Sequence, residues 1–191
     1  MDFVTEVKSL AELARERNPN PQEFGAITHK YQFNPPIGID KVREFEAASG
    51  LTLPEAYVRY LTQIGNGGAG PNYGLFPLEK IKAFYDPNEE IFLDKKDIDE
   101  EWDEICRAYD ESLENDDGEY LKIEQRAFNG SVIIGTPGCT MYTILMCKGE
   151  NYGKIGVIDS DMMEEYVPQI FDKTFEEWIL EYFRKAAGNV N

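Results

Sequence analysis

Residues 53–78 read LPEAYVRYLTQIGNGGAGPNYGLFPL, and within them a helical pattern gives way to an extended one. Pro54 suits the first turn of a helix, and apolar residues follow it at helical spacing. Gly65 is expected to end this helix. The glycine-rich loop after it is expected to need positive φ angles at several positions. The apolar segment 73–78 then predicts a short strand or an extended turn.

Two more helices are predicted on the amino-terminal side. Apolar residues recur at helical spacing through 2–17. The segment 18–36 begins with Asn-Pro-Asn-Pro, which stops that helix, and is expected to be irregular. Asp40 is a good N-cap for the next helix, and Gly50 suits its carboxyl-terminal end.

On the carboxyl-terminal side the period changes to that of strands. Residues 132–134 predict a short buried strand, and 140–147 predict a longer one that is apolar or small on both faces, as in a strand covered on both sides. A hairpin loop leads to a partner strand at 154–159. Thr174 and Glu177 make a capping box for a terminal helix. This order predicts a single α+β domain.

The segment 86–120 differs from the rest in charge. It holds 16 acidic residues and three basic ones, so it carries −13 of the chain's net charge of −17. An amphipathic helix is predicted inside it, with Ile98, Trp102, Ile105, Tyr109 and Leu113 on the apolar side. Its acidic outer face is either a solvated surface or a binding surface for a basic partner. Nucleic acids and anionic membranes are not expected partners, because their charge has the same sign.

The residues that could carry catalysis are sparse. The glycine-rich loop follows a helix and lacks the Lys-Ser/Thr of a phosphate-binding loop. Cys139 and Cys147 would lie about 26 Å apart if 140–147 is one strand, because a strand rises by about 3.3 Å per residue. Cys106 is expected to be a buried thiol, and His29 a structural or surface histidine. A Cys/His nucleophilic site is conceivable, but nothing orients one. We expect no enzyme activity.

No cofactor and no metal site are expected either. Residues 97–101 are rich in carboxylates but lack the central glycine of a calcium loop. One histidine and three scattered cysteines do not predict zinc binding. Weak, adventitious binding of divalent ions to the acidic helix is the open alternative.

The bulk composition predicts a cytoplasmic protein. No apolar run approaches the roughly 18 residues that a membrane-spanning helix needs. The first residues carry acids and lead into no apolar segment of a signal peptide. Three cysteines without CxxC spacing fit a reducing compartment.

Several segments together resemble the SUKH superfamily, in its branch related to the yeast cell-wall-synthesis regulator. They are HKYQFNPP at 29–36, the Phe-Glu to Leu-Pro-Glu-Ala-Tyr stretch of 45–57, and GNGGAGPNYGLFPL at 65–78. Downstream come Gly-Cys-Thr at 138–140, Gly-Lys-Ile at 153–155 and Phe-Glu-Glu-Trp at 175–178. The resemblance spans about 29–183, and the glycine-rich stretch behind a Leu-Pro-x-x-Tyr helix is its most specific part.

The resemblance implies a central mixed or antiparallel sheet flanked by helices. It also implies an immunity protein, which binds and neutralises a toxin domain, often a nuclease, without catalytic residues of its own. A regulatory scaffold without a toxin partner, and a metal- or ligand-binding regulator, are the alternatives. Residues 1–28 are expected to be a helical extension packed on the domain. The domain itself would span 29–191 and carry the acidic helical insert at about 86–120.

Two sets of residues follow as hypotheses. The set expected to face a basic toxin domain is Asp97, Asp99, Glu100, Glu101, Asp103 and Glu104. The set expected to maintain the fold is Pro54, Tyr57, Gly65, Asn66, Gly67, Gly68, Gly70, Pro71, Tyr73, Gly138 and Trp178. The identity of the toxin, the oligomeric state and the choice between a binding and a solubilising role for the acidic helix stay open.

Overall fold

The computed structural model describes residues 2–115 and 118–188 and forms a single α+β domain, as the sequence predicts. Five strands form one antiparallel sheet in the order β1-β2-β3-β4-β5. The strands are β1 (Lys82–Phe84), β2 (Ser131–Gly138), β3 (Met141–Met146), β4 (Lys154–Asp159) and β5 (Gln169–Thr174). The helices are α1 (Phe3–Arg17), α2 (Ala26–His29), α3 (Ile39–Ser49), α4 (Glu55–Arg59), α5 (Asp99–Asn115), α6 (Tyr120–Ala127) and α7 (Phe175–Ala186).

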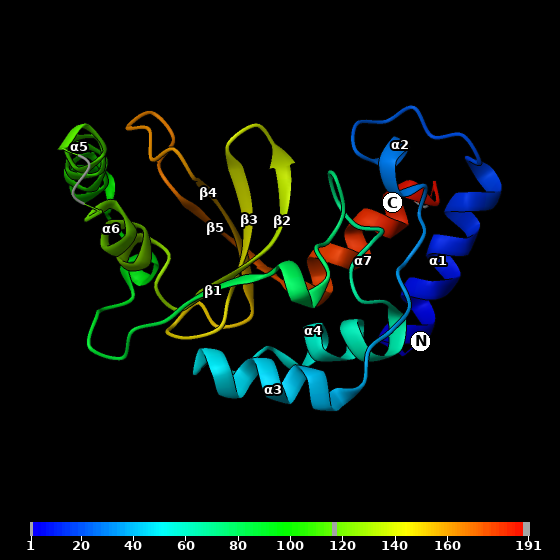
Figure 1. Ribbon diagram of the computed structural model, residues 1–191. Coiled ribbons are helices and arrows are strands. Elements are labelled where there is room, and N and C mark those ends of the chain that lie inside the picture. The colour runs from blue at the N-terminus through cyan, green and yellow to red at the C-terminus, as the bar shows by residue number, and fades with distance from the viewer. Residues whose placement is uncertain (1, 116–117, 189–191) are drawn as a thin grey trace.

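Helices cover both faces of the sheet (Figure 1). Helices α5 and α6 lie against one face, whereas α4 and α7 lie against the other and α1 packs outside α7. Neighbouring strand residues point to opposite faces, so each strand contributes to two apolar clusters. The cluster shared with α1, α4 and α7 includes Val132, Ile134, Leu145, Cys147 and Ile155. The cluster shared with α5 and α6 includes Ile133, Ile144, Met146 and Ile158. The expected strand with two covered faces is thus β3.

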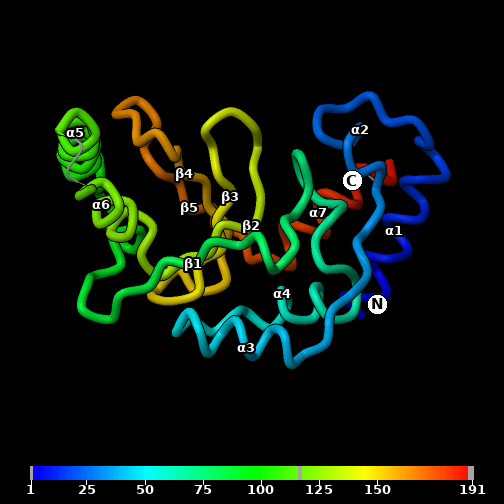
Figure 2. The backbone as a smooth tube through the Cα atoms, viewed as in Figure 1, coloured from blue at the N-terminus to red at the C-terminus, as the bar shows by residue number. Residues whose placement is uncertain are grey.

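The glycine-rich loop connects the helical layer to the sheet. Its backbone leaves α4 through a π-helical turn (Tyr60–Ile64) and runs between α2 and the β2–β3 hairpin (Figure 2). Isolated antiparallel bridges join Phe33 to Gly68, Gly68 to Leu75 and Leu75 to Gly135. Of the 73–78 segment, the part around Leu75 is therefore extended and pairs with β2. Tyr73 lies in a turn, and Leu78 begins a 3-10 helix.

The φ angles of this loop agree with the sequence in part. Gly67 and Gly68 have φ of 77° and 95°, in the left-handed region that favours glycine. Gly65 ends the preceding helical turn, but its φ of −176° is extended backbone that any residue can adopt. What requires glycine there is space, because a Cβ on Gly65 would lie 2.6 Å from the Cβ of Phe33.

The ends of the helices mostly follow their signals. Thr174 and Glu177 form the expected capping box, and Gly50 ends α3 with φ of 71°. The N-cap prediction for Asp40 is wrong, because Gly38 occupies the cap position and α3 begins at Ile39, two residues earlier than an Asp40 cap implies. Asp40 then lies in the first turn, where its charge still favours the positive end of the helix dipole.

The sequence pattern does not predict four of the elements: α2, α6, β1 and β5. Each is short or weakly apolar, and β1 and β5 are the two edges of the sheet. The predicted strand 132–134 is also longer, since β2 runs from Ser131 to Gly138. No helix in the described part of the chain is long and apolar enough to cross a membrane.

Candidate protein-interaction surface

Helix α5 is attached to the sheet by a narrow apolar stripe. Trp102, Ile105 and Cys106 are buried in the cluster on this face. The Trp102 indole stacks on Phe92 with ring centroids 6.2 Å apart, and its N–H donates to the Met163 carbonyl oxygen at 3.2 Å. Residue Leu113, predicted on the apolar side, is instead 49% exposed. Fifteen residues beyond Ile98 the helix has turned that position away from the sheet, and Ser112 is buried instead.

Of the six predicted partner-facing carboxylates, four are exposed to solvent: Asp97, Asp99, Glu100 and Glu104. Asp103 is half-buried. Glu101 differs from the other five because Lys95 contacts it at 2.7 Å and Arg126 at 2.5 Å. The hydrogen bond from Lys95 lowers the pKa of Glu101. Glu101 therefore ties α5 to its neighbours, and its charge is largely neutralised by the two cations.

The loop between β4 and β5 adds carboxylates that the sequence reading missed. Asp161, Glu164 and Glu165 are exposed, and Glu164 lies 4.0 Å from Arg107 of α5. Exposed Met163 and Tyr166 lie between and beside them. This loop lies outside the 86–120 segment, and its contacts with Trp102 and Arg107 show that it lies against α5. We call Asp97, the solvent-facing carboxylates of α5 and those of the 160–168 loop the acidic surface.

Carboxylates of both α5 and the 160–168 loop affect the pKa of the Cys106 thiol. Burial, and after it the negative charges of Glu164, Asp103 and Asp110, raise the pKa of Cys106 to about 12. Thiolate formation is disfavoured here because it would add a negative charge to an apolar site ringed by acids. Cys106 is thus a structural thiol, and its surroundings show that the acids of helix and loop converge.

The residues predicted to maintain the fold lie on the opposite side of the sheet and at its end. Tyr57 is fully buried, whereas Pro54 is the N-cap of α4. The buried amide of Asn66 accepts from the Leu78 N–H at 2.8 Å and donates to the Glu79 carboxylate. This side chain closes the glycine-rich loop across its base.

Two contacts bring distant parts of this set together. Tyr73 is 41% exposed and stacks edge-on against Phe24 at 4.7 Å, and both rings lie beside Gly138, whose φ is 116°. Pro71 and the half-buried Trp178 line one small groove. Gly67 and Gly68 closely approach other backbone in the same region, whereas Gly70 lies against the side chain of Leu75.

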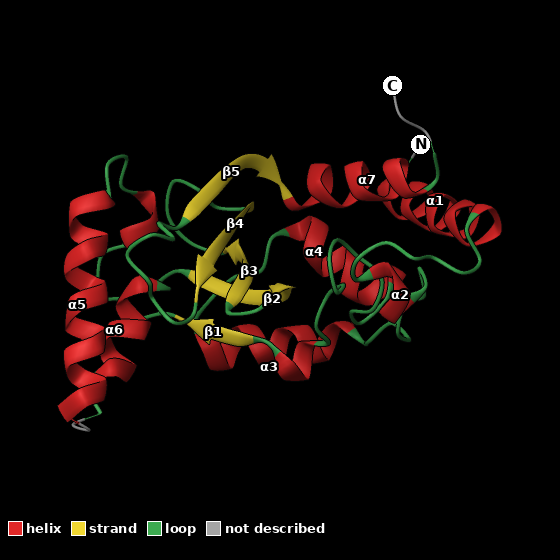
Figure 3. Ribbon diagram, turned by 90° about the horizontal axis from the view of Figure 1, so that it is seen from above, coloured by secondary structure: helices red, strands yellow, loops and turns green. Residues whose placement is uncertain are grey.

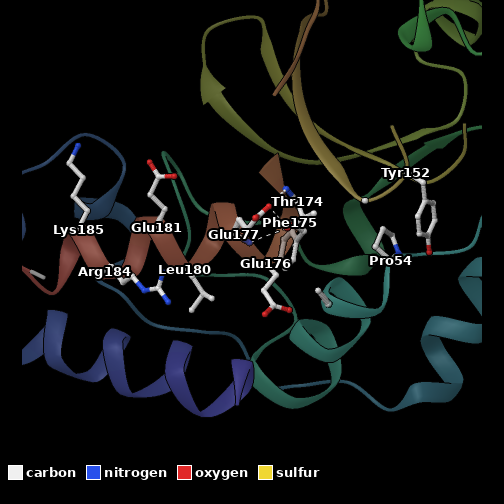
Figure 4. Close-up of a pocket in the computed structure, with 12 residues that line it drawn as sticks. Pro54, Tyr152, Thr174, Phe175, Glu176, Glu177, Leu180, Glu181, Arg184 and Lys185 are labelled. Carbon is white, nitrogen blue, oxygen red and sulfur yellow. Dashed lines mark hydrogen bonds between the residues drawn. The ribbon is translucent and has the colours of Figure 1, made fainter. Parts of the chain in front are cut away.

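A groove of about 1150 Å³ lies between α7, the start of α4 and the 152–153 turn (Figure 4). Tyr152 stands beside Pro54 at one end of it, and Arg184 and Lys185 lie towards the other. Three of its polar side chains have partners within the fold. Thr174 and Glu177 cap α7, and Arg184 pairs with Glu6 of α1 at 2.6 Å.

The histidine and the other cysteines do not meet. The Nδ1 atom of His29 accepts from the Tyr31 N–H at 3.0 Å, and its Nε2 atom lies 3.2 Å from the Tyr182 hydroxyl. Burial lowers the pKa of His29. Cys147 is buried and Cys139 is exposed, and all three cysteines are free. Within residues 2–115 and 118–188, no three His, Cys, Asp or Glu side chains are grouped closely enough to hold a metal ion.

Comparison with known proteins gives one family. No curated protein and no solved structure matches the chain. The family model described as SMI1 / KNR4 family (SUKH-1) matches residues 36–181, which is more than half of the chain. The matched range contains all five strands and the acidic helix, and α1 and α2 precede it. The chain therefore belongs to the SMI1 / KNR4 family (SUKH-1).

Proposed function

We propose that the protein is an immunity protein, which binds a basic, nuclease-type toxin domain in the cytoplasm and neutralises it without catalysing a reaction. The acidic surface is the observation that carries this proposal. It presents exposed carboxylates from two elements, and only Glu164 among its loop acids lies near a base, Arg107. Membership of the SUKH-1 family supports a role in protein interaction. The three free cysteines suit a reducing compartment.

The chemistry of nucleases explains why such a surface would inhibit. A nuclease must hold a polyanion, so its active cleft is usually basic. Carboxylates that dock against the cleft compete with the substrate phosphates. Complementary charge also accelerates association, whereas buried apolar anchors slow dissociation. Exposed Met163 and Tyr166 lie among the carboxylates and supply candidate anchors.

The absence of catalysis is part of the proposal. The groove of about 1150 Å³ commits the Thr174 hydroxyl and the Glu177 carboxylate to the capping box of α7. His29 uses both ring nitrogens within the fold. These groups lack the free, mutually oriented acid, base and nucleophile that a hydrolytic site needs.

The test compares two charge-reversed helices. Glu100 and Glu104 are exposed and lie one turn apart on α5, and Glu12 and Glu16 have the same spacing and exposure on α1. The variants E100K/E104K and E12K/E16K therefore change net charge equally. Binding is measured against candidate toxin domains encoded beside the gene, at low and at physiological salt, and growth is followed when each toxin is co-expressed.

We expect E100K/E104K to weaken binding about tenfold or more and to flatten its salt dependence, because it removes part of the attracting field. The α1 variant should change the affinity much less. Equal effects of the two variants would show that net charge alone matters. If no neighbouring toxin domain binds the unaltered protein, the immunity role is wrong.

A further inference from the structure

Strand β5 forms an open edge of the sheet. It pairs with β4 on one side, and no other strand of the described chain pairs with it. Figure 3 shows β5 at the outer margin of the sheet, whereas α3 runs alongside β1 at the opposite margin. Most of its residues are exposed. An open edge presents a row of unpaired backbone N–H and C=O groups, which can receive another strand.

A groove flanks this edge on each face of the sheet. Ile170 lines a groove of about 890 Å³ on the α5 side, together with Ile98, Tyr166 and Val167. The next residue, Phe171, lines a groove of about 510 Å³ on the α7 side. Successive side chains of an added strand also point to opposite faces. The two grooves are therefore placed to take alternate side chains of a strand paired with β5.

The walls of the two grooves favour a basic occupant. Six carboxylates and four lysines line them. Two of the lysines and two of the carboxylates form ion pairs within the described part of the chain, which leaves four carboxylates and two lysines in the grooves. The side chain of Asp172 is 99% exposed and contacts Lys154 of β4 at 3.1 Å. Glu165 joins the α5-side groove to the acidic surface. The field at the edge thus continues that of the acidic surface.

We infer that β5 receives an extended, basic segment of the partner protein as a sixth strand of the sheet. Backbone hydrogen bonds would supply affinity, and the two grooves would select apolar and basic side chains in alternation. A second copy of this chain is disfavoured as occupant, because each copy carries a net charge of −17 and would repel the other. This inference rests on the proposed function for the basic character of the partner.

The test uses a panel of short synthetic peptides in which lysine or arginine alternates with valine, isoleucine or phenylalanine. Binding is followed by fluorescence anisotropy, and amide hydrogen exchange locates the bound peptide. The strongest peptide should slow exchange in residues 169–173 of β5. Two versions of this peptide carry N-methyl groups on alternate amides, one version along each edge of the extended peptide. One of the two versions should lose binding and the other should keep it. That asymmetry arises because only one edge of the peptide can pair with the strand.

Two matched variants separate the edge from general charge. Asp172→Lys reverses the charge at the edge and removes one exposed ion pair, with Lys154. Because an exposed pair contributes little to stability, the fold should be kept. Glu12→Lys makes the same change on α1. We expect Asp172→Lys to weaken the strongest peptide about fivefold to tenfold and Glu12→Lys to weaken it less than about twofold.

Three results would overturn the inference. One is a panel in which every peptide binds more weakly than about 1 mM. The second is exchange protection on α5 with N-methylated peptides binding as well as the parents. The third is a dimer, detected by sedimentation, that Asp172→Lys dissociates, because β5 would then pair with itself. None of these results changes what the toxin assay with E100K/E104K would show. Conversely, if peptides bind at β5 but no toxin domain binds the protein, the immunity role is refuted and the edge inference stands.

Discussion

The glycine-rich loop and the acidic surface are built in opposite ways. Around the loop, backbone touches backbone: a Cβ on Gly68 would lie 2.7 Å from the Gln32 carbonyl oxygen, and one on Gly135 would lie 2.8 Å from that of Gly74. Helix α5 is attached by a few buried side chains and exposes the rest of its surface. In the first region, the lack of space determines which residue types are tolerated. In the second, only the buried stripe of α5 is restricted in residue type, and the outer positions can carry charge.

The largest effect is expected where the backbones touch. Gly68→Val combines a φ of 95° with close contacts to the backbone of residues 32–34. We expect a loss of about 4 kcal/mol in the free energy of unfolding, from backbone strain and overpacking together. Denaturant unfolding monitored by circular dichroism measures it.

Gly153→Val is the matched control for that prediction. Gly153 has a φ of 85°, but nothing lies within 4 Å of a Cβ built on it. It should lose only the conformational part, about 1–2 kcal/mol. Similar losses for the two variants would mean that the close approach around Gly68 is unimportant and would weaken the contrast between the two regions.

The next effect concerns the base of the same loop. Asn66→Ala removes the acceptor of the buried Leu78 N–H and the donor to Glu79. A buried donor without a partner costs about 1–3 kcal/mol, so we expect a loss near 2 kcal/mol. Exposed Asn88, whose amide bonds only Asp86 nearby, is the control, and Asn88→Ala should change stability by less than about 0.5 kcal/mol. A neutral Asn66→Ala would indicate that the loop closes without this bridge.

On the other side of the comparison, Trp102→Phe tests the attachment of α5. The change keeps an aromatic ring in the cluster but removes the N–H that donates to the Met163 carbonyl oxygen. We expect a loss of about 1 kcal/mol, the usual net value of one such bond. Hydrogen exchange should rise in α5 and in the 160–168 loop. Faster exchange around the glycine-rich loop instead would show that the two regions unfold as one unit.

The sequence predicted those parts of the molecule whose signals are local. The capping box at Thr174, the left-handed end at Gly50 and the central strand β3 each depend on residues close together in the chain. Strands β1 and β5 have no such signal, because an edge strand needs few apolar residues and its pairing partners come from elsewhere in the chain. The shift of Leu113 to solvent likewise reflects drift along one helix, which a spacing pattern records poorly.

The candidate surface was half predictable for the same reason. All six predicted carboxylates reach solvent at least in part, but Glu101 is paired with Lys95 and Arg126, and its pair with Arg126 depends on how α5 meets α6. The contribution of Asp161, Glu164 and Glu165 depends on the order of β4 and β5 in the sheet. Charge density along the sequence locates a charged surface, and the tertiary structure decides which of its charges are available.

The smallest expected effect is a change of stability with pH that arises from His29, the last residue of α2, beside the glycine-rich loop. His29 is the one histidine of the chain, and a Cβ on Gly74 would lie 3.2 Å from its ring. Burial holds the pKa of His29 below its usual value of 6.5. Between the two pKa values the unfolded chain binds more protons than the folded one, so stability rises with pH through this window. Lowering the pH from about 7.5 to about 5.5 should therefore reduce the denaturation midpoint slightly, whereas His29→Gln should remove most of this slope. The acidic surface contains no histidine. If the change of the midpoint with pH is the same in His29→Gln, the carboxylates of the acidic surface cause it, and the two regions do not differ in this respect.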